Sequence, residues 1–190
     1  MELDERILGD IQTYCLAEFS FDIIICWDVL EHLQDPRKAL ENLLRACKPN
    51  GLIILAFPNL FSLKGMITKL TPHGVHIWYY KYFLGAEDPG RDDQPPFPTT
   101  LRLSMSYPAI WKLARSRNAT VQFFAFRESP DMQTIRRRFR IMNALFSTAS
   151  VLSRIFTFGK IDATNSDCIM VLRPSAGRVF LSPKGGAAGA

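Results

Sequence analysis

Two continuous apolar runs, Phe21–Trp27 and Leu52–Phe57, are the strongest strand signals in the hydrophobic pattern. Neither run alternates apolar with polar residues, and this is typical of strands buried on both faces of a parallel sheet. A helix is predicted between them, because Asp35 suits the N-cap and Pro36 suits the first helical position. A strand, a helix and a strand joined by short connections predict a βαβ unit with parallel strands.

The rest of the pattern predicts one α/β domain with a long insertion. Apolar residues recur at helical spacing in the first helix, at Ala39, Leu40, Leu43, Leu44 and Cys47. Further strands are predicted at 7–11, 121–126 and 168–172, and further helices at 60–70, at 106–117 and, as one long helix or a pair, at 132–158. We expect the domain to cover residues 1–174, with a lid or insertion at 60–105 and a disordered tail at 175–190.

Length, the first residues and the cysteines narrow the class of protein. The 190 residues fit one domain with a single hydrophobic core. Glu2, Asp4, Glu5 and Arg6 follow the first methionine, and this polar start argues against a secretory signal peptide. The four cysteines are scattered without a CxxC pair, so we expect a reduced, cytoplasmic protein.

Much of the net charge of +5 comes from one run of arginines, at positions 136, 137, 138 and 140. Such a run is most often a solvated helix face, here on a helix that covers the sheet. The alternative is contact with a membrane surface, because an apolar stripe from Met142 to Phe156 follows the run. No motif for reading nucleic acid accompanies the arginines, so no nucleic-acid partner is expected.

Residues 9–59, GDIQTYCLAEFSFDIIICWDVLEHLQDPRKALENLLRACKPNGLIILAFPN, resemble class I S-adenosylmethionine-dependent methyltransferases. The resemblance is to the small-molecule branch typified by ubiquinone-biosynthesis O-methyltransferases. It rests on the D-x-L-E-H segment, the helix that follows, K-P-x-G and the next apolar strand. It implies a truncated Rossmann-like sheet, mostly parallel, with helices on both faces and a C-terminal helical segment. In such sheets ligands bind outside the carboxyl ends of the strands.

The resemblance implies S-adenosylmethionine as cofactor and assigns five residues to it. Asp10 would accept a hydrogen bond from the adenine amino group, and Ile11 would pack on the ring. Trp27, Asp28 and Val29 would lie beside the methionine portion. Two alternatives stay open, because Asp often caps a turn and Trp27 could fill the core.

The resemblance also implies residues that face a small-molecule substrate. Glu31 and His32 would lie at the edge that faces the substrate, with His32 as the candidate general base because its pKa lies near neutrality. His76, Trp78 and Tyr79, in the aromatic segment of the insertion, would contribute to the substrate wall. His32 could instead only orient its loop through a backbone hydrogen bond. Glu31 and His32 alone are too few ligands for a metal site, so no metal is expected.

One family motif is missing from the sequence. No G-x-G-x-x-G or close variant lies between a strand and a helix, although this motif lets the backbone approach the cofactor. The resemblance begins at about the third strand, which leaves an open apolar sheet edge that a homo- or hetero-oligomer would cover. We therefore expect an S-adenosylmethionine-dependent methyltransferase of a small molecule that is incomplete as a stand-alone chain. The alternative is a catalytically inactive methyltransferase-like binding or assembly partner.

Overall fold

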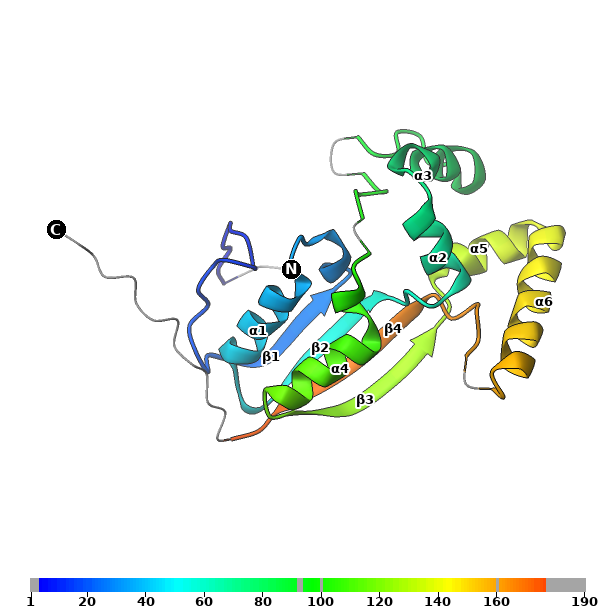
Figure 1. Cartoon of the computed structure of the whole chain (residues 1–190). Coiled ribbons are helices and arrows are strands. Elements are labelled where there is room, and N and C mark those ends of the chain that lie inside the picture. The colour runs from blue at the N-terminus through cyan, green and yellow to red at the C-terminus, as the bar shows by residue number, and fades with distance from the viewer. Residues whose placement is uncertain (1–3, 92–93, 100, 160, 177–190) are drawn as a thin grey trace.

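A computed structural model describes residues 4–91, 94–99, 101–159 and 161–176. A four-stranded sheet forms its centre (Figure 1), in the order β1-β2-β4-β3. The strands are β1 (Phe21–Trp27), β2 (Cys47–Pro58), β3 (Ala119–Arg127) and β4 (Asp167–Pro174). The predicted tail at 175–190 lies outside the described residues from 177 onward.

The α/β class is confirmed, but the sheet is mixed and the prediction of a mostly parallel sheet is wrong. β1 and β2 are parallel, whereas β4 is antiparallel to both β2 and β3. The reason is the connection between β3 and β4. Its two helices, α5 (Pro130–Arg138) and α6 (Arg140–Phe156), lie beyond one end of the sheet (Figure 1), so the chain re-enters the sheet from the end at which it left.

Two helices, α1 (Pro36–Ala46) and α4 (Tyr107–Ser116), cover the same face of the sheet (Figure 1). The N-cap of α1 is as predicted, with the Asp35 carboxylate accepting a hydrogen bond from the Lys38 backbone N–H at 3.3 Å. The buried core joins apolar residues of both helices to alternate residues of the strands, among them Leu40, Leu44, Ile110, Ala114, Cys26, Ile53, Leu55, Met170 and Leu172. The predicted helical stripe of α1 is therefore confirmed as core.

The opposite face of the sheet carries exposed apolar side chains. Ile25 is 65% exposed and Phe123 is 53% exposed. Register joins them in one row across the sheet, because Ile25 pairs with Ile54, and Val171 pairs with both Ile54 and Phe123. Helices on both faces and a first strand buried on both faces were predicted, and both details are wrong. The cause is that α1 and α4 pack on one side only.

The segment before β1 is irregular, so the strand predicted at 7–11 is wrong. Leu8 is 97% exposed, and within the described residues this segment pairs with no strand. It is held against α1 instead, where the Asn42 side-chain amide donates hydrogen bonds to the backbone carbonyls of Ile11, at 2.9 Å, and Tyr14, at 2.5 Å. One side-chain amide thus replaces the strand pairing that the apolar pattern suggested.

The insertion is more ordered than a simple loop. Its first part forms α2 (Leu63–Leu70), α3 (His73–Tyr79) and a short π-helical turn at Tyr80–Leu84. Short 3-10 turns at Leu30–His32 and Leu103–Met105 complete the helical elements that the structure describes. Between residues 86 and 102 the described residues form no regular helix or strand.

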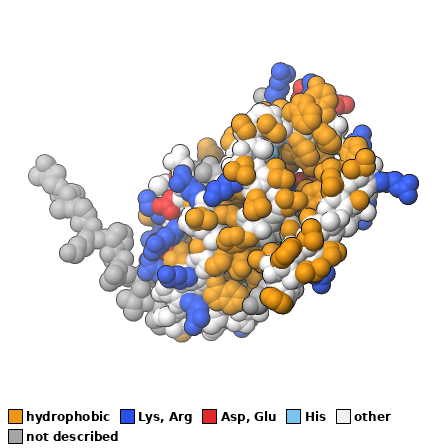
Figure 2. Space-filling model, turned by 45° about the vertical axis from the view of Figure 1, so that its right-hand side comes forward, with side chains coloured by type: hydrophobic (Ala, Val, Ile, Leu, Met, Phe, Trp, Pro, Cys, Tyr) orange, Lys and Arg blue, Asp and Glu red, His pale blue; other side chains and the backbone are white. Residues whose placement is uncertain are grey.

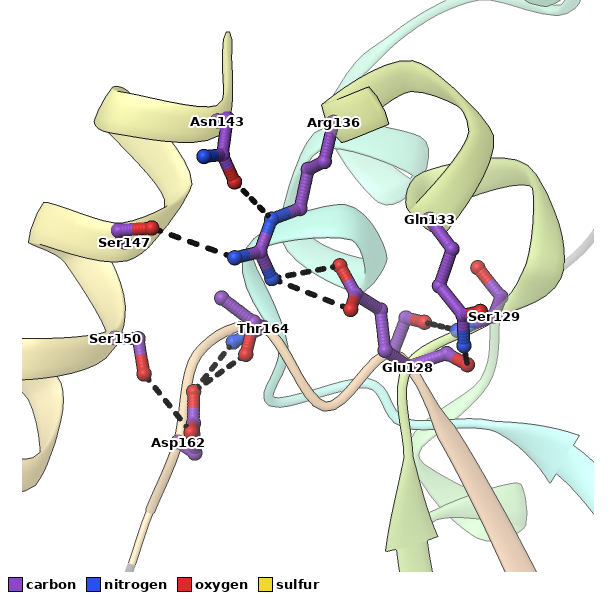
Figure 3. A network of polar contacts seen from close by, with 10 residues as sticks. Glu128, Ser129, Gln133, Arg136, Asn143, Ser147, Ser150, Asp162 and Thr164 are labelled. Atoms are coloured by element: carbon purple, nitrogen blue, oxygen red, sulfur yellow. Dashed lines mark hydrogen bonds and ion pairs between the residues drawn. The ribbon is translucent and has the colours of Figure 1, made fainter. Parts of the chain in front are cut away.

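Arg136 ties α5 to α6 in a polar network (Figure 3). Its guanidinium donates hydrogen bonds to Glu128 at 3.0 Å, to Asn143 at 3.0 Å and to Ser147 at 3.3 Å.

The apolar stripe from Met142 to Phe156 was expected on a helix that covers the sheet, and this prediction is wrong. α6 lies beyond the strand ends (Figure 1), and Phe146 is its one buried residue among those described. Hydrophobic side chains gather on this side of the molecule (Figure 2). Among the described residues, no helix has the length and apolar character needed to cross a membrane.

Candidate functional site

A cavity of about 690 Å³ opens where strands of the sheet end. Trp27 ends β1, Pro58 ends β2 and Arg127 ends β3, while Asp167 begins the antiparallel β4 at the same edge. All four residues line the cavity. The edge at which parallel strands end is the usual ligand-binding edge of an open α/β sheet.

Six of the ten residues predicted for the site line this cavity. They are Trp27, Asp28, Glu31, His32, His76 and Tyr79. The other four, Asp10, Ile11, Val29 and Trp78, do not belong to the lining that the described residues form. The structure thus brings together the end of β1 and part of the aromatic insertion, which are far apart in the sequence. The individual roles of these residues stay predictions.

Asp10 and Ile11 lie in the irregular segment near the start of α1. The Asp10 carboxylate accepts hydrogen bonds at 2.9 Å from the backbone N–H and from the side-chain amide of Gln12. These bonds hold the pKa of Asp10 below its usual value. Ile11 is partly buried against the core. This geometry corresponds to the turn-capping alternative for Asp10.

Glu31 is the most deeply buried charged residue of the cavity lining, at 5% exposed. Its Oε2 atom has no hydrogen-bond partner among the described residues. Burial raises the pKa of Glu31 to about 7, and the nearby carboxylates of Asp28 and Asp167 add to the rise. The hydrogen bond from its own backbone N–H and the positive charge of Lys64 offset part of it. Glu31 therefore exchanges its proton near neutral pH, although it lies almost entirely inside the protein.

Asp28 lies on the sharp turn that leaves β1. Its φ of 51° is in the left-handed region, and its backbone N–H donates a hydrogen bond to the Ala56 carbonyl at 3.0 Å. Burial raises the pKa of Asp28, and the positive charges of Arg127 and Lys64 offset part of that rise. The turn directs the chain from the sheet into the loop that carries Glu31 and His32.

Two ion pairs in the cavity were missed by sequence reasoning. The Lys64 ammonium lies 2.8 Å from the Asp131 carboxylate, and the Arg127 guanidinium lies 3.6 Å from the carboxylate of Asp167. Burial would raise the pKa of Asp131, but Lys64 and further hydrogen bonds hold it below its usual value. Arg127 and Asp167 lie at the ends of apolar strands, and this position in the sequence could have identified them as site residues. Lys64 gave no such signal, because it lies in the first turn of α2.

Three histidines, His32, His73 and His76, line the cavity, and side-chain hydrogen bonds hold His32 and His76. Nδ1 of His32 lies 2.9 Å from the Pro98 carbonyl, which can only accept, so Nδ1 donates and Nε2 carries the lone pair of the neutral ring. Nε2 of His76 lies 3.0 Å from the Thr71 hydroxyl, which itself donates to the Ile67 carbonyl. A backbone carbonyl thus orients His32, which agrees with the alternative that this residue makes a backbone hydrogen bond. Within the described structure, its Nε2 atom is still free to accept a proton.

Aromatic side chains form part of the cavity wall. The Arg127 guanidinium lies 5.1 Å from the centroid of the Trp27 ring. Burial raises the pKa of Tyr79 and of Tyr80, so both phenols stay protonated at neutral pH. Trp78 is not part of the lining that the described residues form; its ring lies 5.4 Å from that of Phe83, and it is 53% exposed. In the part of the chain that the structure describes, no three or more His, Cys, Asp or Glu side chains group closely enough to hold a metal.

Comparison with known sequences places this geometry in context. A family described as "Methyltransferase domain" matches residues 5–125. The mitochondrial ubiquinone biosynthesis O-methyltransferase of Schizosaccharomyces pombe is 30% identical over 44% of this chain and 32% of its own length. The ubiquinone biosynthesis O-methyltransferase of Alkalilimnicola ehrlichii is 35% identical over 32% of this chain and 28% of its own length. The chain thus spans about a third of the length of these curated relatives.

Solved structures give a looser match. The PH0226 protein of Pyrococcus horikoshii OT3 shares 12% sequence identity with this chain, at a TM-score of 0.48. The match covers 89% of this chain and 58% of that protein.

Proposed function

Because the chain belongs to the methyltransferase domain family, we propose that its cavity is the place where a methyl group passes from S-adenosylmethionine to a small molecule. S-adenosylmethionine, the cofactor of this family, supplies an electrophilic methyl group on a positively charged sulfur. One observation carries the proposal. The cavity at the end of β1 gathers an aromatic ring, two carboxylates and a histidine, from Trp27, Asp28, Glu31 and His32.

The residues at the end of β1 fit the methionine portion of the cofactor. Asp28 offers a carboxylate at the cavity, and carboxylates attract the positive charges of a sulfonium and an amino group. The face of Trp27 also suits a cation, since the Arg127 guanidinium already lies over it. The fit is partial, because Asp10 and Ile11, assigned to the adenine by resemblance, do not line the cavity within the described residues.

His32 is the proposed general base toward the substrate. Its Nδ1 donates to the Pro98 carbonyl, so the neutral ring keeps a lone pair on Nε2 that can accept a proton. The edge of the Phe97 ring packs against the imidazole at a centroid distance of 5.9 Å, which further limits its rotation. In this arrangement a backbone carbonyl and an aromatic ring orient the base.

Calorimetric titration with S-adenosylhomocysteine tests the cofactor site. We expect saturable binding, and we expect Asp28→Asn to weaken it by a factor on the order of 10, since a charge-assisted contact contributes about 1.5–3 kcal/mol. Asp22→Asn is the matched control. It removes a carboxylate from the other end of β1, where Asp22 is paired with Lys48 at 2.8 Å.

Failure would take a clear form. A chain that stays folded by circular dichroism but gives no heat with S-adenosylhomocysteine or S-adenosylmethionine would contradict the methyltransferase proposal. It would favour the inactive binding or assembly partner. Equal affinities of Asp28→Asn and the unchanged chain would remove Asp28 from the site without touching the rest of the proposal.

The sheet supports a second proposal, on assembly. β1 is an edge strand of the described sheet, and its side chains Ile23 and Ile25 are exposed. Uncovered apolar edges favour pairing with another chain. We propose that another chain, either a copy of this one or a different protein, covers β1.

A further inference from the structure

The charges of the cavity do not balance. Four carboxylates line it in the described structure, those of Asp28, Glu31, Asp131 and Asp167, against the two permanent cations of Lys64 and Arg127. Lys64 pairs with Asp131, and Arg127 pairs with Asp167. Asp28 and Glu31 have no ion-pair partner within 4.0 Å among the described residues. The cavity therefore holds two unpaired carboxylates, three positions apart at the end of β1.

Glu31 is the more informative of the two. It is 5% exposed, and its Oε2 atom accepts no hydrogen bond from any described residue. The carboxylate has a hydrogen bond from its own backbone N–H, but no described residue supplies a cation within ion-pair distance or a donor to Oε2. A buried carboxylate oxygen without a partner is costly, and proteins normally supply a cation or a donor for it. Since Glu31 lines the cavity and no described side chain pairs with its charge, a positively charged group of a ligand fits this position.

A charge count separates the roles of Asp28 and Glu31. The proposed cofactor carries a sulfonium, an ammonium and a carboxylate, and so brings one net positive charge. Asp28 balances that charge, which leaves Glu31 for the substrate. An anionic substrate would meet Glu31 as a like charge, whereas an ammonium would complete its hydrogen bonds and balance its charge.

We propose that the methyl acceptor is a cationic amine with an apolar or aromatic body, whose ammonium group binds against Glu31. The inference rests on the proposed function, because it names the substrate class of the same cavity. Tyr79, Tyr80 and Phe97 line the cavity and offer aromatic surface to the body of such a molecule.

The reaction balances with this acceptor. With an amine as acceptor, Glu31 takes the role of general base that was proposed above for His32. The substrate ammonium gives one proton to the Glu31 carboxylate, which leaves a neutral nitrogen with a lone pair. That lone pair forms a bond to the methyl carbon, while the carbon–sulfur bond breaks and its electrons go to sulfur. The products are a methylated ammonium, a neutral thioether and a protonated Glu31. A buried carboxyl that titrates near neutral pH is suited to this proton exchange.

Binding of a matched set of probes tests the inference without any turnover. The probes are phenethylamine, the isosteric 2-phenylethanol and 4-ethylphenol, titrated into the whole chain by calorimetry. We expect phenethylamine to bind at least tenfold tighter than either neutral probe. Glu31→Gln should abolish that preference, because the amide keeps the shape of the side chain and removes its charge.

The control variant is Glu18→Gln. Glu18 is an exposed carboxylate outside the cavity, and among the described residues its one ion-pair contact is to Arg45 at 4.0 Å. Its substitution should leave the preference unchanged. The preference should also grow between about pH 6 and pH 8, as Glu31 ionises while the amine stays charged. The charged groups that act on Glu31 in this range are Asp28, Asp167 and Lys64.

Two outcomes would overturn the inference. One is equal or tighter binding of 4-ethylphenol, which would make the acceptor an oxygen. The other is a preference for the amine that survives Glu31→Gln. Titration with S-adenosylhomocysteine tests the proposed function separately. If the chain binds S-adenosylhomocysteine but does not prefer the amine, only the amine inference is contradicted. If it does not bind S-adenosylhomocysteine, the proposed function itself is contradicted.

Discussion

Glu31 is a residue at which stability and function compete. Its carboxyl group is buried, one of its oxygens has no partner among the described residues, and its pKa is about 7 instead of the ordinary 4.5. A raised folded-state pKa means that folding favours the protonated form. The contribution of protonated Glu31 to the free energy of unfolding is therefore complete below about pH 4.5, and it is lost as the pH rises through about 7.

Glu31→Gln should stabilise the chain at alkaline pH and not at acid pH. The difference between the two pKa values corresponds to about 3 kcal/mol, so the variant should gain about that much at pH 8 and almost nothing at pH 4. Urea unfolding at both pH values measures this. Glu18→Gln, at an exposed site, should be neutral at both. A variant that is less stable at pH 8 would mean that the Glu31 carboxylate has a stabilising partner besides its own backbone N–H.

Sequence reasoning found the site residues that follow a strand directly and missed those that arrive from elsewhere. Glu31 and His32 were assigned to the site by resemblance, on the segment that directly follows the apolar run of β1, and both line the cavity. Lys64 and Asp131 also line it, but they come from α2 and α5, whose positions depend on tertiary packing. Asp10 was assigned by resemblance, and its carboxylate is hydrogen-bonded to its own turn.

At the scale of elements, local sequence signals predicted most strands and helices. They failed where the structure of a segment depends on which strand it pairs with. The bounds of β1 and the cap of α1 agree with the sequence, because an apolar run and an Asp-Pro start are local features. The strand at 7–11 failed, because a strand needs a partner and Asn42 holds the neighbouring residues instead. The direction of β4 also depends on where α5 and α6 lie, which no local pattern encodes.

The start of α2 packs directly on the backbone before it, and Gly65 makes this contact feasible. A Cβ atom at Gly65 would overlap the Asn59 carbonyl oxygen, and the Gly65 N–H donates to the Ser62 hydroxyl at 2.9 Å. Gly65→Ala should therefore destabilise the chain by on the order of 2 kcal/mol through overpacking. Thermal or urea unfolding measures the loss.

Gly74 provides the matched control in the neighbouring helix α3. A Cβ atom there meets nothing within 4 Å. Gly74→Ala should be neutral or stabilising by up to about 1 kcal/mol, because alanine favours helix more than glycine does. Equal effects of the two substitutions would show that α2 can move away from Asn59, and the contact would then not fix its position.

At the scale of the whole molecule, the described sheet has one covered and one bare face. The bare face holds the row of Ile25, Ile54, Val171 and Phe123, and its edge strand β1 adds Ile23. Contiguous apolar surface of this kind marks an association site or a tendency to aggregate. The same surface explains why the apolar run of β1 looked like a strand buried on both sides.

This face should make the chain associate with itself and bind a hydrophobic dye. Sedimentation equilibrium should show concentration-dependent association, and Ile25→Lys should shift the chain toward the monomer and lower the dye fluorescence, because a charge on the bare face opposes its burial. Leu70→Lys is the control, since Leu70 is equally apolar and 83% exposed but lies on α2 rather than on the sheet. If both substitutions reduced association alike, general surface hydrophobicity would be responsible. If the chain stays monomeric and does not increase the fluorescence of the dye, the row from Ile25 to Phe123 is covered in solution by other parts of the same chain.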